Sequence, residues 1–199
     1  MSWPALITSI VLTLLLASPF QWFMGAGRDT FVVRQPSQGA LWGQVSFLSG
    51  IAALAWTGLF GGFAIDAGTL GALALTAASV ALYEWARRTV GPQRLHVGLS
   101  GRVPGAVVED GPYRWLRHPF YLAYMLAFGA VALALRSSTG TIVALANIAL
   151  FAGMALHDEA SLARSPLAEA YAAYRRRVGV LLLLPRRARA DAREGAPGA

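Results

Sequence analysis

Apolar residues are gathered in five long blocks along the chain, and the polar residues are concentrated between these blocks. Each block has a length close to the ~20 residues that a helix needs to cross a bilayer. We therefore expect an all-α integral membrane protein with five transmembrane helices and a C-terminal amphipathic helical region. The predicted spans are residues 4–24, 41–65, 69–86, 119–135 and 139–156.

A signal peptide is the alternative interpretation of the first block, residues 4–24. Signal peptides carry basic residues ahead of their apolar core. Met1, Ser2 and Trp3 supply none, so we expect a helix that is retained.

The polar segments between the blocks differ in length. Residues 25–40 and 87–118 are long and contain several glycines, whereas residues 66–68 and 136–138 are short. The short turn at 136–138 predicts that the fourth and fifth spans form a tight antiparallel hairpin. The long connection at 87–118 is of interest because long loops are often functional.

The pattern of the chain changes after His157. Apolar residues recur there at mostly helical spacing with arginines between them, which is typical of amphipathic helices on a membrane surface. We expect one or two such helices, interrupted at Ser165-Pro166. The apolar run Leu181–Leu184 is too short to span a bilayer. Residues 1–185 are predicted to form a single membrane-embedded domain, and residues 186–199 an arginine-, alanine- and glycine-rich tail.

The composition agrees with a membrane protein. Hydrophobic residues make up 56% of the chain and charged residues only 14%, against about a quarter charged in soluble domains. The chain contains no cysteine, which excludes disulfides, thiolate nucleophiles and cysteine-ligated metals.

The basic residues are distributed unevenly. All 17 are arginine, and with five spans every one except Arg136 falls on the side that holds the 25–40 and 87–118 segments and the C-terminus. Because the arginine-rich side of a membrane protein faces the cytoplasm, we expect an integral membrane protein, in the inner membrane of a bacterium, with a cytoplasmic site. The net charge of +7 then indicates affinity for anionic lipid head groups. No nucleic-acid-binding motif is present, so we expect no nucleic-acid partner.

Glu84 is the one charged residue inside the third predicted span, and Arg87 and Arg88 follow it. Its spacing predicts an i,i+4 ion pair with Arg88.

Two polar clusters are expected at the cytoplasmic boundary. Residues 113–121 before and at the start of the fourth span contain Arg114, Arg117 and His118, and residues 157–159 at the end of the fifth span are His157, Asp158 and Glu159. The hairpin should bring the two clusters together. Such a group could form a catalytic site or an ion-pair network that only holds the hairpin closed. The histidines lack the spacing of helical zinc motifs, so we predict no metal site.

The motifs in this region carry a family resemblance. They are Gly111-Pro112-Tyr113-Arg114, Arg117-His118-Pro119-x-Tyr121, Asp158-Glu159-x-x-Leu162, Tyr171-x-x-Tyr174, Arg177-Val178 and Leu184-Pro185. This series resembles the isoprenylcysteine carboxyl methyltransferase family and its phospholipid methyltransferase relatives, over roughly residues 90–185. It departs from the usual pattern at Leu122-Ala123 and at Ser165-Pro166-Leu167.

The resemblance implies a membrane methyltransferase that uses S-adenosylmethionine and a lipophilic, membrane-partitioned acceptor. It implies catalytic roles for Arg117 and Glu159. The cofactor-binding residues that it implies are Tyr113, His118, Tyr121, Asp158, Glu159, Tyr171 and Tyr174, the two last as part of a lid.

Methyl transfer is compatible with these residue types, because the cofactor's methyl group is already reactive and the protein mainly aligns it and excludes water. Arg117 could orient a carboxylate acceptor without a base, whereas an amine acceptor would need a base such as Glu159 or His118. The sequence leaves the acceptor and the oligomeric state open.

Two other classes of protein are alternatives. An NADPH-dependent, steroid-reductase-like membrane enzyme shares an R-H-P-x-Y block, but Phe120 replaces the usual asparagine, and Ala123-Tyr124 replaces a Gly-Glu pair. A non-enzymatic scaffold or transporter would be expected to carry polar or broken spans, which the fourth and fifth blocks are not.

Overall fold

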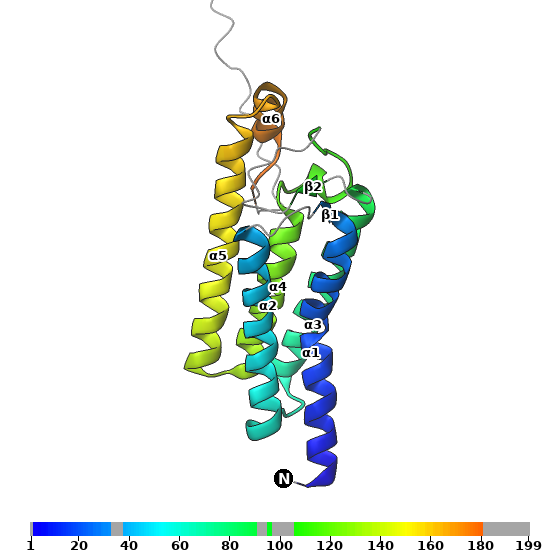
Figure 1. Cartoon of the computed structure of the whole chain (residues 1–199). Helices are drawn as coiled ribbons and strands as arrows, with labels where there is room; N and C mark the ends of the chain where they lie inside the picture. Colours follow the sequence, from blue (N-terminus) through cyan, green and yellow to red (C-terminus); the bar gives the residue numbers. More distant parts are fainter. Residues whose placement is uncertain (1, 33–37, 91–94, 97–105, 181–199) are drawn as a thin grey trace, which may run out of the picture.

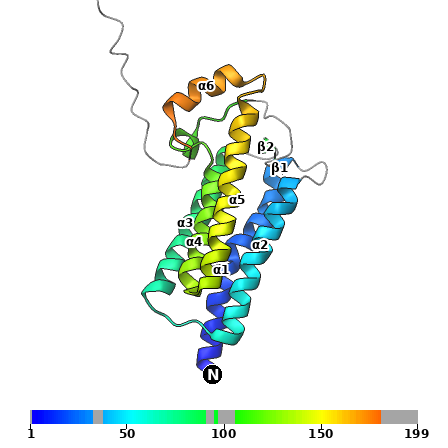
Figure 2. The same ribbon diagram turned by 90° about the vertical axis from the view of Figure 1, so that its left-hand side faces the viewer.

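In the described part of the chain, five long helices pack side by side into a bundle, and a shorter helix lies across one end of it (Figures 1 and 2). The computed structural model describes residues 2–32, 38–90, 95–96 and 106–180. The predicted tail at 186–199 and the run Leu181–Leu184 lie outside the described residues.

The long helices run up and down, so that helices adjacent in sequence are antiparallel (Figure 1). They are α1 (Trp3–Thr30), α2 (Gln38–Trp56), α3 (Ala67–Val90), α4 (Pro119–Leu135) and α5 (Ser138–Leu162), with α6 (Ala168–Arg177) across the end. A π-helical turn, η1 (Thr57–Gly61), extends α2, and a 3-10 turn, η2 (Gly111–Arg114), precedes α4. Two short strands, β1 (Phe31–Val32) and β2 (Leu95–His96), pair in parallel.

Among the described residues, four helices are long and apolar enough to cross a membrane: Trp3–Ala26, Gln38–Gly61, Ala67–Val90 and Ser138–Leu162. The fold is therefore helical with four candidate spans. The remaining predicted span, α4, is apolar and has 17 residues. At ~1.5 Å rise per residue it is about 25 Å long, somewhat less than a hydrocarbon core of about 30 Å.

Several helix ends differ from the bounds of the predicted spans. Helix α1 continues to Thr30, through a glycine-containing stretch predicted as loop, because a glycine inside a helix costs only about 1 kcal/mol. The second helical segment stops at Gly61 instead of residue 65, since Gly62 leaves the helix with φ 75°. Helix α5 continues to Leu162, beyond the predicted end at 156, because its last charged residues find partners there. The interruption at Ser165-Pro166 is confirmed.

Small residues bring α3 and α4 together. The buried face of α3 carries Ala72, Thr76, Ser79 and Ala86, and that of α4 carries alanines at 123, 127, 130 and 134. Ser79 Oγ donates to the backbone oxygen of Ala123 at 2.7 Å. Small residues at a membrane helix interface let the backbones approach closely.

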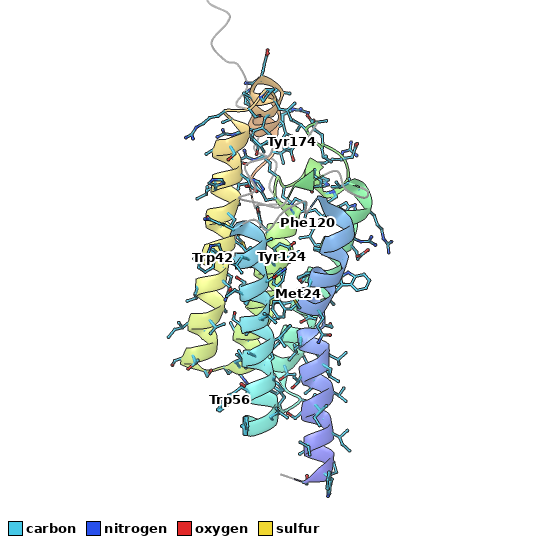
Figure 3. All side chains as sticks on the ribbon, in the orientation of Figure 1. Met24, Trp42, Trp56, Phe120, Tyr124 and Tyr174 are labelled. Atoms are coloured by element: carbon cyan, nitrogen blue, oxygen red, sulfur yellow. The ribbon has the colours of Figure 1, made fainter. Side chains whose placement is uncertain are left out.

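Aromatic side chains fill the centre of the bundle near the end that carries α6. Phe47 of α2, Tyr124 of α4 and Phe151 of α5 contact one another, with ring centroids 5.1 Å apart for Phe47–Tyr124, 5.0 Å for Tyr124–Phe151 and 5.9 Å for Phe47–Phe151. Figure 3 labels Tyr124 within the bundle and Trp56, which is 68% exposed, on the outer side of α2. The aromatic packing fixes α4 and α5 relative to the other helices, which positions the site at their open ends.

The α4–α5 turn is as short as predicted, and it closes the opposite end of the bundle. Arg136 adopts a left-handed conformation (φ 45°) and Ser137 caps α5 by accepting from the Gly140 N–H at 3.1 Å. Arg136 also forms an ion pair with Asp66 at 2.7 Å. Asp66 Oδ1 accepts from the Thr69 N–H at 3.0 Å, and this bond, with the arginine, lowers the pKa of Asp66. The start of α3 is thereby tied to the hairpin turn.

Candidate active site at the open end of the α4–α5 hairpin

The backbone ahead of α4 is folded tightly against α3. Gly111 has φ 55°, and a Cβ there would lie 2.2 Å from Oγ1 of Thr89, so only glycine fits this close approach. Pro112 lies in the first turn of η2, and Pro119 starts α4, where its missing N–H is not needed. This local structure holds Arg117 and His118 at the mouth of the hairpin.

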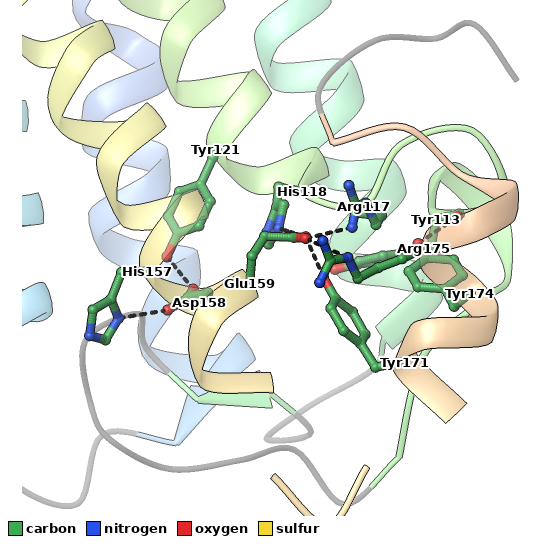
Figure 4. A network of polar contacts seen from close by, with 10 residues as sticks. All are labelled: Tyr113, Arg117, His118, Tyr121, His157, Asp158, Glu159, Tyr171, Tyr174 and Arg175. Carbon is green, nitrogen blue, oxygen red and sulfur yellow. Dashed lines mark hydrogen bonds and ion pairs between the residues drawn. The ribbon is translucent and has the colours of Figure 1, made fainter. Parts of the chain in front are cut away.

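The Glu159 carboxylate is the centre of the polar network at this end (Figure 4). Arg117 Nη1 donates to Glu159 Oε2, and His118 Nε2 lies 2.9 Å from Glu159 Oε1. Arg117 and Glu159 are each only 7% exposed. A buried carboxylate requires a paired cation and further hydrogen bonds, and this site supplies both.

Helix α6 contributes the third side of the network. Tyr171 donates its hydroxyl hydrogen to Glu159 Oε1, and Arg175 Nε lies 3.4 Å from Glu159 Oε2. Tyr174 donates to the backbone oxygen of Tyr113 at 2.7 Å. Two guanidinium groups and one histidine therefore surround a single carboxylate.

The tyrosines of α6 are held as neutral donors. Burial is the main cause that raises the pKa of Tyr171, and its bond to Glu159 raises it further. Burial likewise raises the pKa of Tyr174. Since a raised pKa favours the protonated phenol, both hydroxyls remain hydrogen-bond donors at neutral pH.

Asp158 forms a second, separate pair on the neighbouring part of α5. Its Oδ2 accepts from the Tyr121 hydroxyl at 2.7 Å, and its Oδ1 lies 3.7 Å from His157 Nδ1. The Asp158 side chain is 27% exposed and that of His157 is 50% exposed. This pair is more accessible than the Glu159 network. In Figure 4 the contacts of Asp158 and those of Glu159 lie on opposite sides of the last turns of α5.

The structure confirms the prediction that the two polar clusters lie close together. Arg117, His118, Glu159 and Tyr171 converge on one point, while Tyr121 and Asp158 pair beside it. Tyr113 and Tyr174 lie beside this point, where the hydrogen bond from the Tyr174 hydroxyl to the Tyr113 backbone oxygen joins α6 to η2. The exposed Arg114 is not part of the described network. Within the described residues, no three His, Asp or Glu side chains come together as a metal site.

Sequence reasoning missed Arg175 as a member of the site. A signal was present, because Arg175 follows Tyr171 by four residues and therefore lies on the same face of a helix. The run Arg175-Arg176-Arg177 was predicted only as part of an amphipathic surface helix, with no role for Arg175 in the site.

The network can bind both an anion and an amino or hydroxyl group. Nε of Arg117 is buried and has no hydrogen-bond partner among the described residues, so it can donate to a further acceptor. Arg175 is 47% exposed at its side chain and keeps donors available for an anion such as a carboxylate. The Glu159 and Asp158 oxygens can accept from amino or hydroxyl groups.

Apolar spanning helices with a buried arginine–histidine–glutamate network at one end define a helical integral membrane protein with an enzyme-like site. Residues 68–165 match the family described as PEMT, phospholipid methyltransferase. This match, over about half of the chain, confirms the resemblance of the motifs to the phospholipid methyltransferase relatives of the isoprenylcysteine carboxyl methyltransferase family. No curated protein and no solved structure matched the chain.

The matched segment covers α3, η2, α4 and α5, and it ends at Ser165, before α6. It therefore contains Arg117, His118 and Glu159 but not Tyr171 and Tyr174. The match favours a membrane methyltransferase over the reductase interpretation.

Proposed function

We propose that the chain is an S-adenosylmethionine-dependent methyltransferase that acts on a lipophilic acceptor from the bilayer, in the manner of isoprenylcysteine carboxyl methyltransferases. The observation that carries the proposal is the convergence of Arg117, His118 and Glu159 within the matched segment. The bound cofactor would supply a methyl group that is already electrophilic.

The donors and acceptors of the site suit the polar end of this cofactor. The buried Nε of Arg117, which has no hydrogen-bond partner among the described residues, and the half-exposed Arg175 can bind a carboxylate. Glu159 can accept from an amino group or from ribose hydroxyls. The residues present therefore fit the cofactor, with Arg117 and Glu159 in catalytic roles. Tyr113, His118, Tyr121, Asp158, Tyr171 and Tyr174 complete the binding site.

The chain's residues would act mainly by orientation and by exclusion of water. Helix α6 covers the Glu159 network and separates it from the aqueous phase. The aromatic packing below Tyr121 borders the site on the membrane side, where a lipophilic acceptor would approach. A carboxylate acceptor would be oriented by an arginine, whereas an amine acceptor would lose a proton to a base such as His118.

The proposed placement in the membrane follows from the arginine distribution. We infer five spans, α1 to α5, with the N-terminus outside and the site end in the cytoplasm of a bacterial cell. The length of α4 is compatible with spanning if the bilayer thins locally or if its ends lie in the interface.

The test is transfer of label from methyl-labelled S-adenosylmethionine to lipid by the detergent-purified protein. We expect label in the organic phase when a total membrane lipid extract or a prenylated cysteine derivative is supplied. A protein that stays folded, fails to bind S-adenosylmethionine and binds NADPH instead would overturn the proposal and support the reductase alternative.

A further inference from the structure

A second polar cluster lies on the outside of the bundle, where α1 and α3 meet near the end that carries the candidate site. Trp22 Nε1 of α1 donates to Glu84 Oε1 of α3 at 2.9 Å. Arg87 donates to both oxygens of the same carboxylate, from Nε and from Nη2, each at 2.8 Å. The carboxylate of Glu84 is thus occupied by a two-pronged arginine contact and by an indole.

Arg88 is only weakly attached to this cluster. Its Nε lies 3.5 Å from Glu84 Oε2, beyond the usual length of a hydrogen bond. The predicted i,i+4 ion pair is therefore present but weak, and Arg87 is the stronger partner. The Arg88 side chain is 78% exposed, compared with 34% for Arg87 and 16% for Glu84. Two guanidinium groups share one carboxylate, so the cluster has an excess positive charge. The exposed side chain of Arg88 places this charge on the outer surface of the bundle.

Two half-exposed tryptophans accompany this charge. Trp22 is 47% exposed and Trp85 is 49% exposed. Trp85 precedes Arg88 by three residues, so the two side chains are neighbours on the surface of α3. Tryptophan is enriched at the level of lipid head groups because its ring is apolar and its N–H is polar. The cluster therefore has the features of a site at the membrane–water boundary.

The surface next to Arg88 on α3 is apolar and smooth. Toward the middle of the helix, its outer face continues with exposed alanines at 74, 77, 78 and 81. A free phosphate ion would gain nothing from this surface, whereas the acyl chains of a lipid would lie along it. Arg88 also directly precedes Thr89, whose side chain packs against Gly111 at the start of the site-bearing segment.

We propose that Arg88, flanked by Trp22 and Trp85, binds the phosphate of an anionic phospholipid whose acyl chains lie along the alanine face of α3. A guanidinium group makes strong, charge-assisted hydrogen bonds to phosphate oxygens. The site lies on the outer surface of the bundle, apart from the Glu159 network, and does not depend on the chain's being a methyltransferase.

The test is quenching of tryptophan fluorescence by brominated lipids in reconstituted vesicles. Brominated phosphatidylglycerol and brominated phosphatidylcholine are compared at equal mole fractions, and the ratio of their binding constants is the readout. We expect a preference for phosphatidylglycerol that Arg88→Gln lowers about fivefold, the factor that corresponds to about 1 kcal/mol per arginine near an anionic surface. Arg164→Gln, which removes another exposed arginine, should leave the preference unchanged.

Two further variants locate the bound lipid. Trp85→Phe should remove part of the phosphatidylglycerol-specific quenching, whether or not Arg88→Gln folds, and Arg88→Lys should retain part of the preference. Equal preference in wild type and Arg88→Gln would overturn the proposal, as would an unchanged quenched fraction in Trp85→Phe. Loss of the preference on addition of inorganic phosphate at constant ionic strength would overturn the assignment to a lipid.

Discussion

Glu159 Oε1 lies 2.9 Å from Nε2 of His118, although the two residues are 41 positions apart in the sequence. The contact forms because α4 and α5 are joined by a turn of minimal length and return to the same end of the bundle. It is reinforced by Arg117 and by Tyr171 of α6. Three separate parts of the chain are thus joined at one carboxylate.

Helix α6 should be required for cofactor binding, because it supplies Tyr171 and Arg175 to Glu159. A truncation after Ala163 keeps α5 complete and removes α6. We expect it to lose measurable S-adenosylmethionine binding, as seen by calorimetry. A truncation after Pro185 removes only residues 186–199 and should bind normally. Normal binding by the shorter protein would show that α6 is not part of the site.

The meeting of Arg117, His118 and Glu159 could be predicted from sequence because it depends on little besides the length of one turn. Two apolar blocks joined by three residues must run antiparallel, so their polar ends must meet. The ends of the helices could not be predicted in the same way. Whether α1 continues through Gly25 and α5 through Asp158 depends on tertiary partners, which override weak local preferences.

The membrane topology is tested by reporter fusions. Fusions after Ala199 and within the Arg136–Ser138 turn should report opposite sides of the membrane, with the C-terminal fusion in the cytoplasm. The reason is the distribution of the arginines: with five spans, every arginine except Arg136 lies on the side of the C-terminus, and the arginine-rich side faces the cytoplasm. If both fusions report the same side, α5 does not span, and the five-span arrangement is wrong.

The packing of the bundle is tested by a pair of glycines on α2. A Cβ at Gly50 would lie 2.9 Å from Cζ of Phe20 and 3.2 Å from Cε1 of Phe128. Gly50→Ala should therefore destabilise the protein by about 1–3 kcal/mol through overpacking. Gly43→Ala, with nothing within 4 Å of the added Cβ, should be neutral or stabilise by up to about 1 kcal/mol. Thermal unfolding of both variants in the same detergent provides the measurement. Equal melting temperatures would contradict the described α1–α2–α4 packing.

Contacts between distant helices left no sequence signal at all. Nothing in the pattern pairs Trp22 with Glu84, 62 residues later, because neither lies in a motif and no short turn connects α1 with α3.

The role of Arg175 could not be predicted for a different reason. Its helical register with Tyr171 could be read, but the length and position of α6 were needed before the register identified Glu159 as its partner.

The Glu159 network is proposed to bind the cofactor, in addition to holding the α4–α5 hairpin closed. The alternative is plausible on physical grounds, since breaking a buried ion pair commonly destabilises a protein by about 3–5 kcal/mol. The decisive comparison needs a variant that weakens the hairpin elsewhere. Asp66→Asn serves this purpose, because it disrupts the ion pair with Arg136 at the opposite end of the bundle.

The most direct measurement is S-adenosylmethionine affinity by calorimetry, with melting temperature measured on the same samples, for wild type, Glu159→Gln and Asp66→Asn. We predict that Glu159→Gln remains folded and binds more than about tenfold more weakly, a loss of at least ~1.4 kcal/mol, and that Asp66→Asn melts earlier but binds like wild type. Arg117→Ala should behave like Glu159→Gln. A folded Glu159→Gln protein with wild-type affinity and a lowered melting temperature would contradict the account.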